Sequence, residues 1–244
     1  MRYFIKFSYN GTNYHGWQKQ PNASTVQEEL TKCISVLLKE EVELMGAGRT
    51  DTGVHAYQMF AHFDTLSTFN SDKIVTKLNS FLSNDILIYS IYKVKEDTHA
   101  RFTATARTYK YFVSNKKDIF NPNLHLVLKD FDLDKMNTAC SYLLGEQDFT
   151  SFSKVNTDTF TNNCDITKAI WTKEGDVFVF TISANRFLRN MVRSVVGTLL
   201  DVGIGKVKVE AVKKIIEKKD RCAAGTSVPA KALFLTEIKY PKEI

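Results

Sequence analysis

A single acidic residue lies in a glycine-rich stretch of the chain. Asp51 stands between Gly48 and Gly53, with Arg49 two positions before it. Glycines let the backbone turn tightly and let another molecule approach closely. An acid beside a cation in such a loop is typical of a site that presents a carboxylate to a negatively charged substrate. The alternative is an aspartate that only caps a turn, which is the commoner role of this residue among glycines and threonines.

The loop does not fit two familiar phosphate-binding patterns. No Gly-Lys-Ser/Thr follows, so it is not a Walker A loop. The residues after it, from Tyr57 to Asp64, predict a strand, whereas a dinucleotide-binding loop leads into a helix.

A second segment alternates cations and aromatic residues at positions 107–111. On a strand, Arg107, Tyr109 and Tyr111 share one face, and Lys110 lies on the other. Such a face can stack a nucleobase on a ring and hold its phosphate with a guanidinium. Taken alone, the segment is more typical of an edge strand with half-buried tyrosines.

A third segment carries Arg186, Arg189 and Arg193. Their spacings of three and four predict one basic stripe on a helix from about residue 186 to 202. A solvated charged face is the usual explanation. However, a guanidinium beside an apolar helix face tends to have a fixed partner, because it is costly to bury alone.

The loop from Asn10 to Gln20 gathers aromatics, amides and a lysine. It is either an ordered turn with Trp17 in the core, or a segment that contacts phosphates and bases.

Periodicity and caps predict that the chain is α+β. The first half reads as a strand, a helix opened by Ser24 and Thr25, two strands around the glycine loop, a second helix and a strand. The expected ranges are 2–9, 26–38, 42–45, 57–64, 71–82 and 85–94.

The second half is expected to repeat this order with a different sequence. The expected ranges are 108–114, 132–144, 166–173, 177–184, 186–202, 209–219 and 233–240. Each half then resembles the βαββαβ arrangement of RNA-recognition modules. We expect two such units, residues 1–105 and 106–244, with antiparallel sheets joined side by side and an active-site cleft between them.

Composition narrows the class of protein. The chain has 244 residues and a formal charge of +6, from 33 basic and 27 acidic side chains, which allows a polyanionic partner without establishing one. Its four cysteines and five histidines form no metal-binding or redox motif, which predicts free thiols in a reducing compartment. The N-terminus has no signal-peptide pattern, and no apolar run could span a membrane. A cytoplasmic protein is the simplest reading.

Several of these segments together resemble the tRNA pseudouridine synthase A family. The matching motifs are residues 9–20, 46–56, 99–102 with 107–111, 148–152, and 187–197, in the family's order over nearly the whole chain. The Gly-Arg-Thr-Asp sequence at 48–51 is the most specific of them.

The resemblance implies roles for particular residues. Asp51 matches the catalytic aspartate, and Tyr109 matches the tyrosine that stacks on the target uracil. Arg193 matches the basic residue that pairs with the catalytic carboxylate. Arg49 matches an arginine that helps extrude the target nucleotide and contacts its backbone. The resemblance also implies a homodimer without metal or organic cofactor, acting on uridines 38, 39 and 40 of the tRNA anticodon arm.

The reaction suits this set of residues. Pseudouridine forms when the C1′–N1 bond breaks, the base turns and C5 joins C1′, so no electrons are exchanged with a partner. A carboxylate can act as the nucleophile, and a paired arginine opposes the rise in pKa that burial causes. Whether Asp51 adds to C1′, adds to C6 or removes a sugar proton is not decided by the residues.

Two other functions stay open at this stage. A non-catalytic RNA-binding protein with two recognition modules explains the sheets, the aromatics and the charge, but not a lone acid in a glycine loop. A metal-dependent nuclease is a weaker alternative, because no other acids cluster near Asp51 in the sequence.

Overall fold

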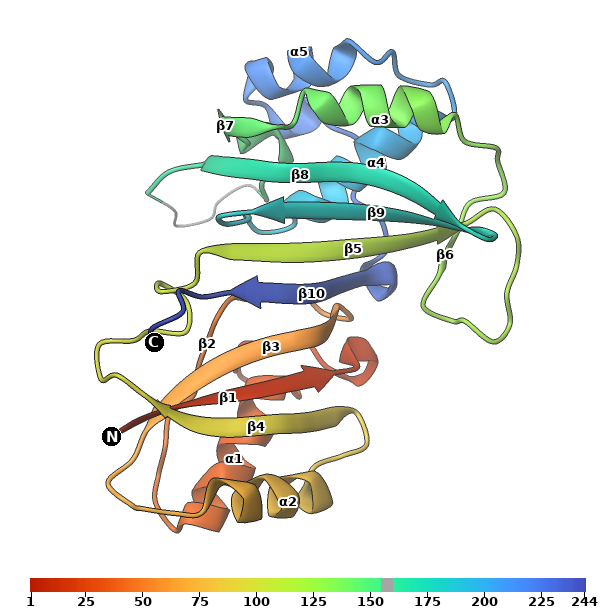
Figure 1. Cartoon of the computed structure of the whole chain (residues 1–244). Helices are drawn as coiled ribbons and strands as arrows, with labels where there is room; N and C mark the ends of the chain where they lie inside the picture. Colours follow the sequence, from red (N-terminus) through yellow and green to blue (C-terminus); the bar gives the residue numbers. More distant parts are fainter. Residues whose placement is uncertain (155–159) are drawn as a thin grey trace. The chain divides into compact units, whose positions relative to one another are not determined.

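The computed structural model describes residues 1–154 and 160–244, which group into two units (Figure 1). The first unit contains residues 1–105 and 234–244, and the second contains residues 106–233. Both units combine helices and sheet, and the predicted α+β class is confirmed. Within the described part of the chain, no helix is long and apolar enough to cross a membrane.

The first unit follows the predicted βαββαβ order and adds one strand from the end of the chain. Its elements are β1 (Arg2–Tyr9), α1 (Val26–Leu38), β2 (Met45–Gly46), β3 (His55–Asp64), α2 (Ser71–Phe81), β4 (Ile86–Val94) and β10 (Leu233–Lys239). The strands lie in the order β4-β1-β3-β10, and β2 pairs with β3. The β1 strand is antiparallel to both of its neighbours, whereas β10 is parallel to β3.

The first helix shows how local sequence sets an element's limits. The Thr25 side chain accepts a hydrogen bond from the Glu28 N–H and so caps the helix. The buried residues Val26, Leu30 and Ile34 repeat every four positions, which gives one apolar face. The helix ends at Leu38, and Lys39 after it adopts a left-handed conformation with φ 55°.

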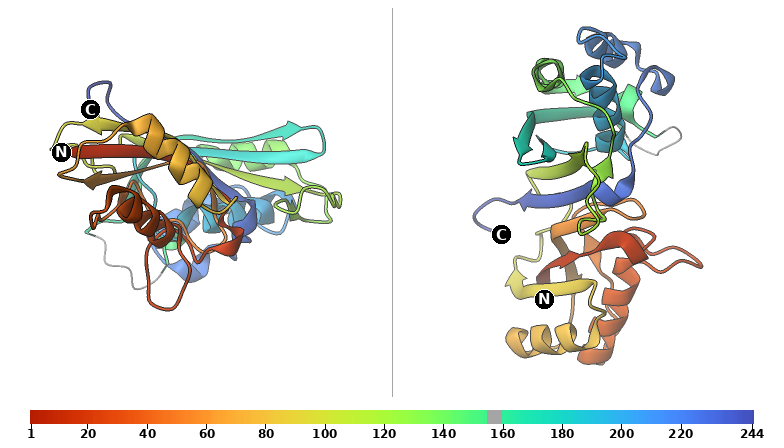
Figure 2. Two further views of the ribbon diagram at one scale, coloured as in Figure 1. Left: turned by 90° about the horizontal axis from the view of Figure 1, so that it is seen from below. Right: turned by 90° about the vertical axis from the view of Figure 1, so that its right-hand side faces the viewer.

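The core of the first unit uses both faces of β1. Tyr3 and Phe7 on one face of β1 are buried, and Phe4 on the other face is fully buried as well. Tyr240 packs edge-on against Phe4 at 5.2 Å between ring centroids. Tyr240, which follows β10, therefore covers part of the sheet face on which Phe4 lies. In the same unit, α2 contacts both α1 and β4 (Figure 2).

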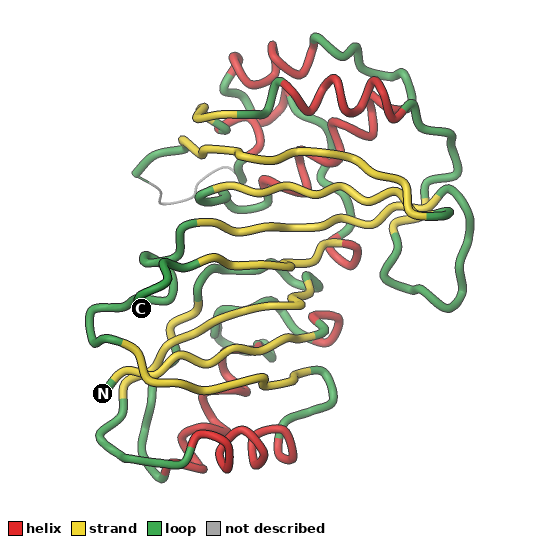
Figure 3. The backbone as a smooth tube through the Cα atoms, viewed as in Figure 1, coloured by secondary structure: helices red, strands yellow, loops and turns green. Residues whose placement is uncertain are grey.

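The strands of the second unit are mostly antiparallel. Its elements are β5 (Ala106–Ser114), β6 (His125–Leu126), α3 (Leu133–Ser141), β7 (Gly145–Asp148), β8 (Asn163–Glu174), β9 (Val177–Ala184), α4 (Met191–Gly203) and α5 (Ala211–Lys218). The strands lie in the order β5-β9-β8-β7, and α3 packs against both α4 and β8 (Figure 3).

The second half differs from the predicted repeat in the grouping of its last strand. The expected unit of residues 106–244 included the last strand, but residues 234–244 group with the first unit. The Phe234–His55 and Leu235–Ala56 pairs join β10 to β3. Alternation identifies a strand but carries no information about its partner, and β10 reaches its partner from the far end of the chain.

Candidate active site

The loop between β2 and β3 holds Asp51. The Asp51 carbonyl accepts a hydrogen bond from the Val54 N–H at 3.1 Å, and Gly53 has a φ of 76° that closes this turn. The Asp51 side chain is half-buried and Arg49 is exposed. The turn is of the kind that an aspartate among glycines forms, so the simple structural role and a chemical role are compatible here.

The residue before Asp51 is held by the segment that follows β1. The Trp17 N–H donates to the Thr50 carbonyl at 3.3 Å, and the hydroxyls of Tyr9 and Thr50 share a hydrogen bond of 2.9 Å. On the other side of Asp51, the Gly53 N–H donates to the Tyr14 carbonyl at 3.3 Å. The main chain on both sides of the carboxylate is therefore fixed by one loop.

Gly16 makes this contact possible. Its φ is 91°, a conformation that side-chain-bearing residues rarely adopt. A Cβ at this position would overlap the Thr50 carbonyl oxygen and would lie 3.1 Å from the Asp51 carbonyl carbon. The two loops approach so closely that only glycine fits between them.

The loop from Asn10 to Gln20 is itself anchored in the core. Trp17 is 3% exposed and stacks on Phe7 at 5.5 Å, so the alternative in which Trp17 fills the core is confirmed. The Gly11 N–H donates to His55 Nδ1 at 3.0 Å, and His55 is buried. This bond requires an unprotonated Nδ1 on His55.

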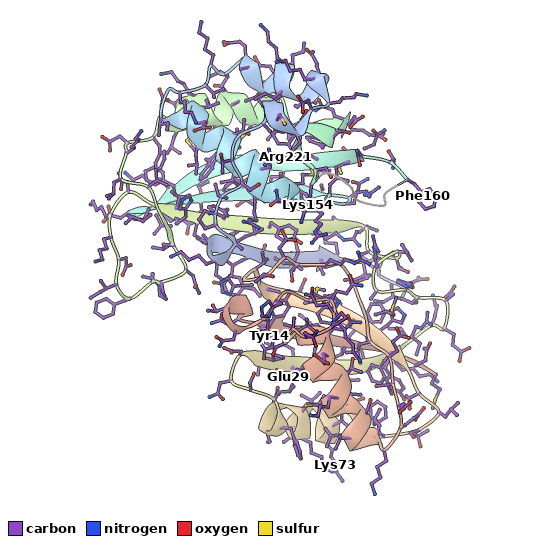
Figure 4. All side chains as sticks on the ribbon, turned by 180° about the vertical axis from the view of Figure 1, so that it is seen from behind. Tyr14, Glu29, Lys73, Lys154, Phe160 and Arg221 are labelled. Atoms are coloured by element: carbon purple, nitrogen blue, oxygen red, sulfur yellow. The ribbon has the colours of Figure 1, made fainter. Side chains whose placement is uncertain are left out.

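Tyr14 ties the same loop to α1. Its hydroxyl donates to a Glu29 carboxylate oxygen at 2.7 Å and also lies 2.9 Å from the Ser83 hydroxyl (Figure 4). Burial, which outweighs the opposing effect of the Ser83 contact, raises the pKa of Tyr14 to about 12. A tyrosine that stays protonated keeps its donor, and the loop that supports Asp51 keeps its anchor.

Tyr109 lies on β5 in the second unit, opposite Ile182 of β9. Its ring is half-buried and meets Phe187 edge-on at 5.2 Å. Tyr111 is fully buried, and its hydroxyl donates to the Pro229 carbonyl at 3.0 Å. Of the two tyrosines that the strand pattern placed on one face, Tyr111 belongs to the core and Tyr109 remains partly exposed.

The predicted stripe of three arginines on one helix is wrong. The α4 helix begins at Met191, and Asn190 before it adopts a left-handed conformation with φ 66°. Asparagine tolerates this conformation better than most residues, and it interrupts helical geometry there. Arg186 and Arg189 therefore precede the helix, and the Arg186 guanidinium donates to the Thr161 carbonyl at 3.2 Å.

Arg193 lies in the first turn of α4 and is half-buried. Its Nε donates to the Val228 carbonyl at 2.7 Å, and the Val228 N–H donates to the Arg193 carbonyl at 3.2 Å. The expectation that this arginine has a fixed partner is met by a backbone carbonyl within the second unit.

The segment at residues 224–229, which holds Arg193, is itself held by Arg221. One Arg221 nitrogen donates to the Gly225 carbonyl at 3.2 Å and another to the Ser227 hydroxyl at 3.0 Å (Figure 4). Gly197 of α4 meets Thr226 so closely that a Cβ there would overlap the Thr226 carbonyl oxygen. Sequence reasoning missed Arg221, because nothing in its neighbourhood distinguishes it from a surface arginine after a helix.

The four residues singled out from the sequence thus fall into two pairs. Asp51 and Arg49 share a loop of the first unit, and Tyr109 and Arg193 belong to the second unit. Residues 1–154 and 160–244 contain no group of three or more His, Cys, Asp or Glu side chains that could hold a metal ion. The cysteines at 33, 140, 164 and 222 are free thiols, as predicted.

A buried histidine on β3 is expected to make the stability of the folded state depend on pH. His62 is 4% exposed, and its Nδ1 accepts a hydrogen bond from the Ala100 N–H at 3.2 Å. Burial first, and the positive charge of Arg2 second, lower the pKa of His62 to about 4. In the unfolded chain this histidine takes up a proton at its ordinary value near 6.5, so the folded state loses stability as pH falls from about 7 toward 4.

We expect this loss to be smaller in His62→Asn, whose amide oxygen can accept the Ala100 bond without titrating. The difference between the two proteins is on the order of 3 kcal/mol at most. Urea unfolding at pH 7 and pH 4.5 measures it, with the exposed His15→Asn as a control that follows the wild type. Parallel pH curves for all three proteins would contradict the assignment.

Comparison with known proteins shows to which family the chain is similar. A family model described as tRNA pseudouridine synthase matches residues 6–103 and 139–241. These ranges include Arg49, Asp51 and Arg193, whereas Tyr109 lies between them.

Relatives of similar length match the chain from end to end. A tRNA pseudouridine synthase A from Bacteroides thetaiotaomicron is 54% identical over 247 residues, which cover 100% of this chain and 92% of the relative. One from Parabacteroides distasonis is 52% identical over 245 residues, covering 100% and 97%. One from Aliivibrio salmonicida is 42% identical over 246 residues, covering 100% and 94%.

Proposed function

The chain belongs to the tRNA pseudouridine synthase family, and we propose that it acts on uridines 38, 39 and 40 of the tRNA anticodon stem-loop with Asp51 as the nucleophile. The family membership makes it an isomerase that converts uridine to pseudouridine in tRNA. The proposal further includes a homodimer in the cytoplasm that uses neither a metal nor an organic cofactor. The positions in tRNA and the homodimer follow from the sequence resemblance.

One observation supports the role of Asp51 most directly. The main chain on both sides of this half-buried carboxylate is hydrogen-bonded to the loop after β1, through Thr50 and Gly53. A nucleophile gains from being held in one orientation, because its ordering is then complete before the substrate binds. A turn with only a structural role does not need hydrogen bonds from another loop to the main chain on both sides of its aspartate.

The proposed chemistry needs only groups of this kind. The C1′–N1 bond breaks, the detached uracil turns, and C5 bonds to C1′. C5 then loses its proton to water and N1 takes one up, and the bond that the nucleophilic carboxylate forms during the reaction is broken again. Arg193 has the role of pairing with the catalytic carboxylate and fixing its orientation. Arg49 contacts the backbone of the extruded nucleotide.

Tyr109 has the role of receiving the target uracil. Extruding a nucleotide costs a few kcal/mol, and stacking on an aromatic ring returns about 1–3 kcal/mol of this. The half-buried ring of Tyr109, set edge-on against Phe187, is suited to this role because its orientation is already fixed.

Tyr109→Phe is expected to bind tRNA with an affinity within about twofold of the wild type, because the ring remains for stacking. Turnover is expected to fall about tenfold or more, because the hydroxyl that helps to manage protons is lost. Single-turnover kinetics and filter binding measure the two effects, with Tyr89→Phe on β4 as a matched exposed tyrosine. If Tyr109→Phe turns over normally, only the stacking role survives.

Tritium release tests the proposed substrate positions. Joining C5 to C1′ displaces the C5 hydrogen, so tRNA transcripts labelled with tritium at C5 of uridine report each conversion. We expect release from transcripts with uridine at 38, 39 or 40, and none when all three are cytidine. Release that continues from the cytidine transcript would overturn the positions but not the isomerase activity. Activity that disappears after chelation would overturn the metal-free proposal.

A further inference from the structure

The turn after β4 carries an exposed aromatic ring that the proposed active-site roles leave unused. Phe102 is 76% exposed, although burying a phenylalanine side chain stabilises a protein by about 1.5–3 kcal/mol. It belongs to the motif at residues 99–102, one of those on which the family resemblance depends.

His99 fixes the conformation of this turn. Its Nδ1 accepts hydrogen bonds from the Arg101 N–H at 3.0 Å and the Phe102 N–H at 3.4 Å. Its main chain bonds Thr103 twice, from the His99 N–H to the Thr103 hydroxyl and from the Thr103 N–H to the His99 carbonyl, both at 2.9 Å. The backbone N–H groups of Arg101, Phe102 and Thr103 are therefore all hydrogen-bonded to His99.

The turn is also fastened to the core of the first unit. The Ala100 N–H donates to His62 of β3, and the Ala100 carbonyl accepts from the Tyr240 hydroxyl at 2.6 Å. Arg2 of β1 donates to the Thr98 carbonyl at 3.1 Å. Three separate strands or their extensions hold the turn, so the exposed ring sits on a rigid base.

The surroundings of the ring suit an RNA base. The His99 ring lies 4.4 Å from the Phe102 ring at an angle of 37°, and the Arg101 guanidinium carbon lies 5.5 Å from its centroid. An exposed ring with a guanidinium beside it combines stacking for a base with a charge for its phosphate. The high exposure of Phe102 leaves ring surface open for such a partner.

We propose that Phe102 stacks on an unpaired base of the tRNA other than the target uridine, and that Arg101 contacts an adjacent phosphate. This inference rests on the proposed function only in taking tRNA as the ligand. An exposed ring with an arginine is also typical of a protein interface. RNA is favoured because the chain carries a charge of +6 and its family acts on tRNA.

The test compares Phe102→Leu with Phe102→Tyr, which keeps the aromatic ring. In Phe102→Leu we expect Kd and KM for tRNA to rise about fivefold or more, with kcat within about twofold of the wild type. Phe102→Tyr is expected to have Kd and KM values close to those of the wild type. Phe81→Leu, which changes an exposed phenylalanine at the end of α2 in the same way, is expected to leave Kd and KM unchanged. In Arg101→Gln, the slope of log Kd against log salt concentration is expected to fall by about one.

Thermal unfolding and sedimentation of the same variants complete the test. Unchanged tRNA affinity in Phe102→Leu would overturn the proposal, and so would a loss of self-association that accounts for the weaker binding. A loss of tRNA affinity that only follows unfolding would also count against it. Wild-type protein that neither binds tRNA nor releases tritium would instead overturn the proposed function, so the two failures are distinguishable.

Discussion

Asp51→Asn is expected to abolish conversion of uridine while leaving the Kd for tRNA within severalfold of the wild-type value. The amide has nearly the same size, and the main-chain carbonyl that accepts the Val54 N–H at this position is the same in both residues. It is neither a nucleophile nor a base, so the fall in kcat is about a thousandfold or more. Tritium release under single-turnover conditions measures the chemistry, and filter binding measures the affinity.

The matched control is Asp72→Asn, which removes an exposed carboxylate in the first turn of α2. It changes the net charge of the protein by the same amount and is expected to keep wild-type turnover. Residual activity near wild type in Asp51→Asn would rule out this residue as the nucleophile. A loss of tRNA binding by more than about a hundredfold would instead show that the carboxylate acts in recognition.

Local patterns predicted the elements of the first unit well, for reasons seen in single residues. The cap at Thr25 and the apolar repeat of Val26, Leu30 and Ile34 are both short-range features, and the helix they predict is present. The predicted start of the helix was wrong between Arg186 and Asn190. The spacing of apolar residues in α4 continues toward the N-terminus into this segment, although its residues are not helical. One left-handed asparagine decides that limit, and an asparagine in the sequence does not by itself predict the end of a helix, because its helix propensity is less than about 1 kcal/mol below that of alanine.

The partner of β10 was beyond such patterns. A strand was expected at residues 233–240 and is present, but nothing in the sequence indicated that Phe234 and Leu235 pair with β3. The ring of Phe234 then stacks on His55 at 4.4 Å, beside the loop that carries Asp51. Contacts between residues so far apart in the chain depend on the packing of the whole unit, which no window of sequence contains.

The candidate site divides in the same way. Asp51 and Arg49 could be found from residue type and spacing, because a charged pair in a glycine loop is unusual. The support of Asp51 could not, because it consists largely of main-chain groups such as the Trp17 N–H, which every residue type except proline carries. Gly16 is the part of this support that can be seen in the sequence. Only the structure shows that the absence of a side chain there leaves room for the loop that carries Asp51.

Gly16→Ala is therefore expected to damage both stability and turnover. The new methyl group overlaps the Thr50 carbonyl oxygen, and the φ of 91° is strained for alanine. Together these effects cost on the order of 3 kcal/mol of unfolding free energy. The peptide that must move is the one before Asp51, so kcat is expected to fall about tenfold or more in the fraction that remains folded.

Gly145→Ala separates strain from displacement. Gly145, at the start of β7, has a φ of 86°, nearly that of Gly16, but no atom lies within 4 Å of an added Cβ. It should lose stability through backbone strain alone, about 1 kcal/mol, and keep its kcat. Urea unfolding and single-turnover tritium release, both measured well below the midpoint of either variant, compare the two. Equal kcat values for both alanine variants would mean that the contact between the loops does not control the position of Asp51, whereas a fall confined to Gly16→Ala would tie the catalytic carboxylate to the loop after β1.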